Sequence, residues 1–203
     1  MSTSALVFLA LAALCVFWAV GAHNRLVRLS HAVVAAYAPV DAYLRARQLM
    51  LHRWLEGVAA SGLGRAERTD IAQALQAVQN ALEEASRRSL GPAELTRLSQ
   101  AEQALDEALA GLWSGAADPQ GATRSALRGL IQPLFEANEQ IALTAVPYLA
   151  ALLAYNQAVT EFPAVLVARL SRLRALPEFS VREPAAYRWA AAEAQPGQTQ
   201  RET

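Results

Sequence analysis

The hydrophobic and polar positions of this chain follow the period of a helix over most of its length. The first stretch differs, because residues 5–22 are apolar or small on every side of a helix. A helix that is apolar all round lies in a protein core or in a membrane. Its length fits a bilayer core, which takes about 17–25 residues, and no charged side chain precedes Arg25. We predict a transmembrane anchor over residues 1–22. Its large apolar side chains are Leu6, Val7, Phe8, Leu9, Leu11, Leu14, Val16, Phe17 and Val20.

Two processing signals compete with this interpretation. Small residues at 20–22 would suit a signal-peptidase site, but the preceding region lacks basic residues and the apolar run exceeds a usual signal sequence. A lipoprotein would be acylated at Cys15, but Leu14 stands where a small residue is needed. An anchor fits the stretch better than either. Cys15 is the only cysteine, which excludes an intramolecular disulfide, and we interpret it as a small apolar membrane residue.

The arginines near the anchor predict its orientation. Arg25, Arg28, Arg45 and Arg47 follow the apolar stretch, whereas only the terminal amine precedes it. The positive-inside rule then places the bulk of the chain in the cytoplasm, with a single pass through the membrane. The rule is less strict for long soluble domains, so the side of the membrane stays a prediction.

After the anchor, apolar residues recur at three- and four-residue steps, which is typical of amphipathic helices. Pro39, Pro133 and Pro147 fall inside these helices and predict bends. The stripe of the last long segment includes Tyr148, Tyr155 and Phe162, which we expect in the core. The predicted helices are 23–61, continuous with the anchor or close to it, then 66–89, a third from Pro92 to a loop at 114–121, 122–162, and a short one after Pro163.

These patterns predict an all-α protein. Each segment has one apolar face and could not be stable alone, and short connections make neighbouring helices antiparallel. We expect an N-terminal transmembrane helix followed by an elongated antiparallel four-helix-type bundle over residues 23–180. Residues 181–203 lose the pattern and form a C-terminal tail, largely disordered at its end.

The charges of the chain cancel. Eighteen basic residues, all of them arginine, balance eighteen acidic ones, and 54% of the chain is hydrophobic. No net field therefore points to nucleic acid or to an acidic substrate.

Motifs for catalysis or metal binding are missing from the sequence. The histidines His23, His31 and His52 are not preceded by the glutamate of a Glu-x-x-His di-iron motif, and no HExxH or Cys/His cluster occurs. The glycines of 62–64 start like a dinucleotide loop, but no strand precedes them and Glu67 occupies the third glycine's place. We therefore predict no metal, no cofactor and no enzymatic activity.

Charged pairs at four-residue spacing are the remaining polar features. Asp41 and Arg45 can pair along one helix face, or Asp41 can face a neighbouring helix and fix its register. Residues 83–84 can pair with residues 87–88. We interpret these pairs as a solvated helix face or, alternatively, as an electrostatic docking surface.

Two stretches resemble the LemA family. Residues 23–55 are similar to the family's first helix, YNxLVxLRxxVxxAWxxIDVxLKRR, although Ala46 interrupts the basic pair after Leu44. Residues 155–168 are similar to its YNxxIxxFPxxLxA signature. Residues 139–142 are similar to its ENxIA segment, with Asn138 and Glu139 exchanged in order. The matched positions, to which the resemblance assigns structural or interaction roles, are Asn24, Tyr37, Asp41, Leu44, Arg45, Arg47, Glu139, Tyr155, Asn156, Phe162 and Pro163.

The resemblance implies a helical bundle anchored to a bacterial membrane, with no catalytic role. One branch of the family takes part in organising magnetosome membranes. It therefore implies a scaffold or adaptor that recruits other membrane-associated proteins, self-association included. A membrane-tethered sensor is the alternative, with a small apolar ligand pocket near Pro133 or Pro147 lined by Tyr148 and Tyr155.

Overall fold

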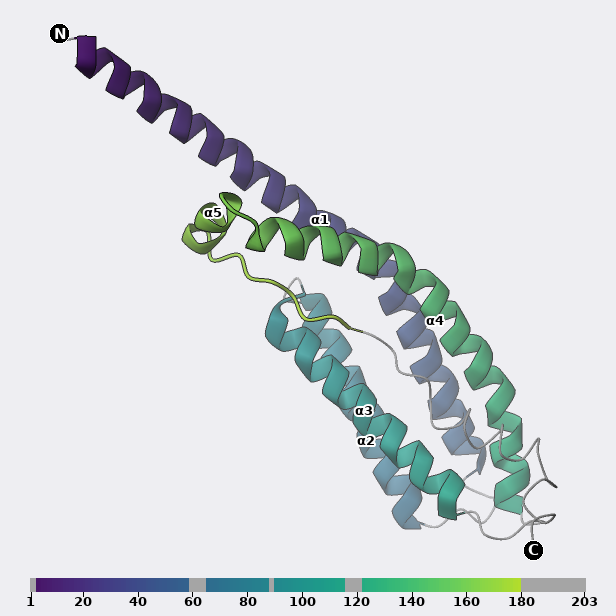
Figure 1. Cartoon of the computed structure of the whole chain (residues 1–203). Helices are drawn as coiled ribbons and strands as arrows, with labels where there is room; N and C mark the ends of the chain where they lie inside the picture. Colours follow the sequence, from purple (N-terminus) through teal and green to yellow (C-terminus); the bar gives the residue numbers. More distant parts are fainter. Residues whose placement is uncertain (1–2, 59–64, 88–89, 116–121, 180–203) are drawn as a thin grey trace, which may run out of the picture. The chain divides into compact units, whose positions relative to one another are not determined.

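The described part of the chain is helical. A computed structural model gives the placement of residues 3–58, 65–87, 90–115 and 122–179, and no strand occurs among them. The all-α class is thereby confirmed (Figure 1). The helices are α1 Thr3–Val58, α2 Arg65–Arg87, α3 Pro92–Gly115, α4 Ala122–Thr160 and α5 Ala164–Leu170.

The two long helices continue through the prolines at which we predicted bends. The predicted anchor and the predicted first helix form a single helix, α1, which continues through Pro39. Likewise, α4 continues through Pro133 and Pro147. The predicted loop begins later than expected, because α3 extends to Gly115. Residues 116–121 of that loop and the predicted tail, 181–203, lie outside the described residues.

The chain divides into two compact units. Unit 1 comprises Met1–Ala38 and Ala145–Glu178, and unit 2 comprises Pro39–Thr144 and Phe179–Thr203. The helices α1 and α4 therefore each contribute to both units. The division falls at Pro39 in α1 and two residues before Pro147 in α4. A proline removes a backbone hydrogen bond, so these are the positions at which a long helix bends most easily.

Unit 2 has a core of aliphatic side chains. Helices α2 and α3 pack along each other, joined by a short turn at Leu90, whose φ of 54° lies in the left-handed region. Glu67 in the first turn of α2 and Arg87 in its last turn complement the helix dipole. Apolar residues at three- and four-residue steps are buried along both helices: Ile71, Leu75, Val78 and Leu82 on α2, and Leu95, Leu98, Leu105, Leu109 and Leu112 on α3.

Unit 1 contains the start of α1, whose apolar side chains are exposed on all sides. The apolar stretch of α1 has the length and composition of a membrane-crossing helix, and none of it is buried in the structure. Residues 128–160 of α4 meet the same criterion of length and composition, but they are partly buried. Their buried side chains, including Leu134 and Tyr148, belong to the cores of the two units, as expected for a core helix.

Candidate functional site

A cluster of polar side chains lies in the core of unit 2. The Arg47 guanidinium donates from Nη1 to Asn138 Oδ1 at 2.8 Å and from Nη2 to Glu102 Oε2. Arg47, Glu102 and Asn138 are only 3%, 7% and 5% exposed, and they come from α1, α3 and α4. In this low-dielectric environment each bond is strong, and a lost partner is costly.

Helix periodicity explains why these side chains are buried. Arg47 lies three residues after Leu44 and four before Leu51, both of which are core residues. Glu102 and Asn138 take equivalent places, four residues after Leu98 and Leu134 and three before Leu105 and Ile141. Each helix thus replaces one apolar side chain of its stripe by a polar one at the same level of the core.

The cluster is only partly satisfied. Three buried atoms of the cluster have no hydrogen-bond partner among the described residues: Arg47 Nε, Glu102 Oε1 and Asn138 Nδ2. A buried ion pair of this kind adds little net stability, because desolvation offsets the attraction. It does penalise any shift that separates the partners, so the cluster fixes the register of α1, α3 and α4.

A second polar contact joins α1 to α2. The predicted pair forms, since Arg45 Nε donates to Asp41 Oδ2 at 2.8 Å. Arg45 Nη2 also donates to Leu82 O at 3.2 Å and to Ser86 Oγ at 2.8 Å. Asp41 thus pairs along its own helix, and it is Arg45 that contacts α2.

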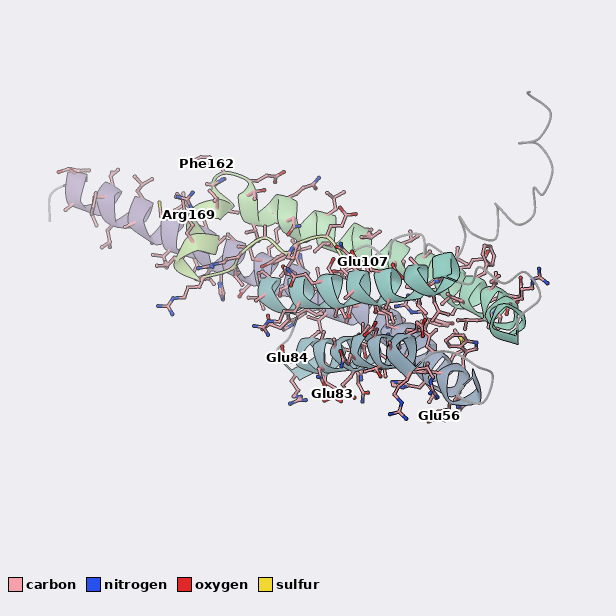
Figure 2. All side chains as sticks on the ribbon, turned by 90° about the horizontal axis from the view of Figure 1, so that it is seen from below. Glu56, Glu83, Glu84, Glu107, Phe162 and Arg169 are labelled. Carbon is pink, nitrogen blue, oxygen red and sulfur yellow. The ribbon has the colours of Figure 1, made fainter. Side chains whose placement is uncertain are left out.

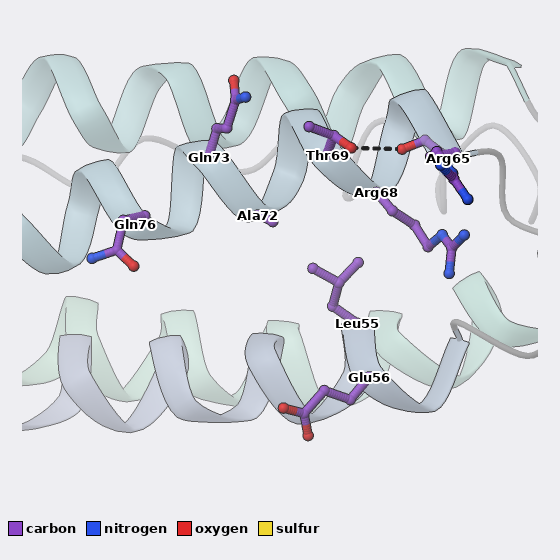
Figure 3. Close-up of a pocket in the computed structure, with 8 residues that line it drawn as sticks. All are labelled: Leu55, Glu56, Arg65, Arg68, Thr69, Ala72, Gln73 and Gln76. Atoms are coloured by element: carbon purple, nitrogen blue, oxygen red, sulfur yellow. Dashed lines mark hydrogen bonds between the residues drawn. The ribbon is translucent and has the colours of Figure 1, made fainter.

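A groove of about 500 Å³ lies between the end of α1 and the start of α2 (Figure 3). Leu55 points from α1 towards α2, and Arg68 points from α2 towards α1, whereas Gln73 points away. An apolar floor with a polar rim is typical of surfaces that bind proteins. The lining residues are Leu55, Glu56, Arg65, Arg68, Thr69, Ala72, Gln73 and Gln76.

The core of unit 1 combines aliphatic side chains with buried tyrosines. The rings of Tyr37 and Tyr148 meet edge to face, with centroids 5.5 Å apart and planes at 62°. Burial, with a contribution from the Glu178 carboxylate, raises the pKa of Tyr148 to about 12. Burial also raises the pKa of Tyr155. Neither tyrosine lines either of the two cavities that we describe, in contrast to the pocket of the sensor hypothesis.

The signature residues Tyr155 and Asn156 hold the segment that follows α5. Asn156 Nδ2 donates to Leu176 O at 2.8 Å, and Leu176 N donates to Asn156 Oδ1 at 2.9 Å. Tyr155 Oη donates to Arg174 O at 3.0 Å. Residues 173–178 are not helical, so their backbone groups need such partners.

Phe162 does not belong to the core. We expected it to continue the stripe of Tyr148 and Tyr155, but α4 ends at Thr160 and the Phe162 side chain is exposed. A side chain just past the end of a helix no longer follows the helical period, and that expectation was wrong. Pro163, which caps α5, is exposed as well.

The other matched positions divide between surface and core. Asn24 and Glu139 are exposed, and Leu44 is buried. The resemblance drew attention to Glu139, whereas its neighbour Asn138 is the residue in the buried cluster. A polar residue at a stripe position was the signal that could have identified both Asn138 and Glu102.

The described residues offer no group of three or more His, Cys, Asp or Glu side chains that could hold a metal ion. His23 Nδ1 lies 3.0 Å from Ser171 Oγ, and His31 is exposed. The site is therefore a set of contacts between helices.

A comparison with known protein families identifies the family of this chain. The model of the LemA family matches residues 37–191, more than half of the chain. The chain belongs to the LemA family. No curated protein and no solved structure matches it. The LemA match includes the buried cluster and the signature residues Tyr155 and Asn156, whereas Asn24 precedes it. LemA proteins are not known as a family of enzymes.

Proposed function

We propose that this LemA-family protein is a membrane-anchored scaffold or adaptor, which recruits other membrane-associated proteins through unit 2. One observation carries the proposal. A single helix, α1, contains both the exposed apolar stretch and the residues Leu44, Arg47 and Leu51 of the unit 2 core. A surface on unit 2 thereby belongs to the same continuous helix as the proposed anchor.

The surface of unit 2 supports this role. Glu56, Glu83, Glu84 and Glu107 point outwards from three of its helices (Figure 2). The groove between α1 and α2 adds an apolar element beside these charges. Polar surfaces with a small apolar centre are common in non-obligate protein interfaces.

Photo-crosslinking in native membranes tests recruitment. A photoreactive amino acid replaces Gln76 in the groove or, as a matched exposed control, Gln132 on α4 of the same unit. We expect discrete adducts of defined mass from position 76 and fewer from position 132. Adducts at twice the mass of the chain identify self-association. If neither position yields an adduct, unit 2 does not recruit proteins, and the proposal fails.

We further propose that unit 2 faces the cytoplasm of a bacterial cell, because the arginines closest to the apolar stretch all follow it. A Cys15→Ser, Ser99→Cys variant carries one thiol, at an exposed position of α3. A maleimide that cannot cross the inner membrane should label it only after lysis. Labelling of intact cells would place unit 2 outside the cytoplasm.

A further inference from the structure

The end of the apolar stretch marks a depth along α1. Residues 5–22 are apolar or small, Trp18 lies in the last turns, and Arg25 is the first charged residue. A bilayer core takes about 20 helical residues, and Trp and Arg side chains favour its boundary. If α1 spans a membrane, as the proposed function requires, the segment from Trp18 to Arg25 lies at the bilayer surface.

The turn from α4 to α5 lies against this same segment. A cavity of about 340 Å³ lies between this turn and α1, and residues of both line it. At the other end of α5, Ser171 Oγ lies 3.0 Å from His23 Nδ1. Both ends of α5 are therefore held at the level of the bilayer surface. The cavity is lined by Trp18, Gly21, Ala22, Arg25 and Leu26 of α1 and by Ala158, Glu161, Phe162, Pro163 and Ala164.

Large apolar side chains project from this turn. Phe162, Leu166 and Leu170 follow one another at four-residue steps and are 81%, 57% and 87% exposed. Between Leu166 and Leu170, Val167 and Ala168 are buried against the rest of unit 1, so α5 has a buried face and an exposed face. An exposed apolar patch of this kind marks an interaction site. Its occupant must be available at the depth of Trp18 and Arg25, and at that depth it is the lipid.

The charges around the patch complement an anionic membrane. Unit 1 contains five arginines, all exposed: Arg25, Arg28, Arg169, Arg172 and Arg174. Only Glu161 and Glu178 oppose them. Figure 2 labels Phe162 and Arg169, which represent the apolar and the basic part of this surface. Apolar side chains flanked by arginine are typical of segments that lie in the headgroup region of anionic bilayers.

We propose that the segment Phe162–Leu170 is a second membrane contact, which inserts Phe162, Leu166 and Leu170 into the surface of an anionic phospholipid bilayer beside the anchor. The guanidinium groups of Arg169, Arg172 and Arg174 bind lipid phosphates. Contact at two points would restrict tilt and rotation of α1, which a single spanning helix does not control. The proposal rests on the proposed function only in requiring α1 to span the bilayer.

Depth-dependent quenching in proteoliposomes tests this contact. Full-length protein with Cys15→Ser receives one cysteine, Leu166→Cys or Leu170→Cys, which carries an environment-sensitive fluorophore. The matched control is Ser99→Cys, an exposed position of unit 2. Spin-labelled phospholipids with shallow quenchers in vesicles containing phosphatidylglycerol should abolish most of the fluorescence at positions 166 and 170, and none at 99. A further protein labelled at the native Cys15, which lies near the bilayer centre if α1 spans the membrane, is measured with deep quenchers and reports whether the anchor is inserted.

The outcomes separate the two proposals. Quenching at 15 without quenching at 166 and 170 leaves the anchor in place and overturns the second contact. No quenching at 15 overturns the anchor itself. Labels at 166 and 170 that are shielded from water-soluble reagents yet unquenched by lipid show that a second copy covers the patch, which also overturns the contact.

Changing the arginines tests the headgroup interaction. In the variant Arg169→Gln, Arg172→Gln, Arg174→Gln, quenching at position 166 should fall in vesicles containing phosphatidylglycerol and stay unchanged in phosphatidylcholine alone. Equal quenching of the variant and the parent protein in both vesicles would refute the role assigned to the arginines.

Discussion

Units 1 and 2 are built on the same two helices, α1 and α4, but they carry opposite charge. The sequence of unit 1 has five arginines and two glutamates, whereas residues 39–144 have ten arginines and thirteen acidic residues. The formal net charge of zero for the whole chain conceals this division. A balanced total therefore does not exclude electrostatic specificity, because the basic part complements an anionic surface and the acidic part does not.

The two units also differ in how they use buried polar side chains. In unit 1, Tyr155 and Asn156 bond to backbone groups of a non-helical segment. In unit 2, Arg47 bonds to the side chains of Glu102 and Asn138. The backbone groups of helices are mostly satisfied internally, so a polar side chain between packed helices pairs mainly with other side chains, although Arg45 also reaches the carbonyl of Leu82. An irregular segment has backbone groups without a helical partner, and polar side chains can form hydrogen bonds with them.

The largest expected effect comes from breaking the buried cluster. Arg47→Leu leaves Glu102 buried without its cation and should cost about 3–5 kcal/mol of unit 2 stability. Hydrogen exchange of α2 and α3 amides measures that loss, and α5 in unit 1 provides the internal reference. Association with membranes should be unchanged.

A triple variant separates charge from packing at this site. Arg47→Leu, Glu102→Leu, Asn138→Leu removes every charge of the cluster and should recover most of the loss, because an apolar core needs no pairing. If the triple variant is as unstable as Arg47→Leu alone, the shape of these side chains matters more than their charge.

High pH should destabilise unit 1. The folded state raises the pKa of Tyr148 from 10.0 to about 12, so the folded state holds the proton more tightly than the unfolded state. Stability is therefore complete below pH 10 and falls by about 2–3 kcal/mol as the pH rises to 12. Hydrogen exchange cannot be followed at such pH, so we suggest near-ultraviolet circular dichroism of the tyrosines.

Tyr148→Phe is the matched control for this titration. Tyr148 Oη has no hydrogen-bond partner among the described residues, so the variant loses no bond. It should unfold at higher pH than the parent protein, with neutral-pH stability unchanged or slightly increased. An unchanged alkaline transition would show that another group causes it.

A smaller loss is expected from the clamp on the segment after α5. Asn156→Ala removes both bonds to Leu176 and should destabilise residues 173–178 by about 1–2 kcal/mol. Asn156→Asp retains the acceptor for Leu176 N but places a carboxylate oxygen against Leu176 O, so it should destabilise the segment at least as much as Asn156→Ala. Amide exchange of residues 173–178 measures the effect. An equal effect on α2 and α3 would mean that the two units do not respond separately.

The sequence predicted the helices well and the positions of polar side chains less well. The period of leucines marks the core faces of α2 and α3 because those faces are simply apolar. Glu102 and Asn138 occupy positions of the apolar stripes. In the sequence, a polar residue at such a position only interrupts the stripe, because its partner on another helix is not known. The exposure of Phe162 could not be predicted from the sequence either, because the end of α4 at Thr160 depends on packing in unit 1.

The surface pairs of unit 2 should give the smallest effect. Arg87 Nη2 lies 2.6 Å from Glu83 Oε2, with side chains 71% and 41% exposed. Solvent and salt screen such a pair, so Glu83→Gln should change stability by no more than about 0.5 kcal/mol. Denaturant unfolding at low and high salt measures it. A small effect means that the acidic face of unit 2 is not needed for folding and is free to meet a partner. A loss comparable to that of Arg47→Leu would instead make this face part of the fold. The proposed contrast between a unit 1 that contacts lipid and a unit 2 that contacts proteins would then lose its electrostatic basis.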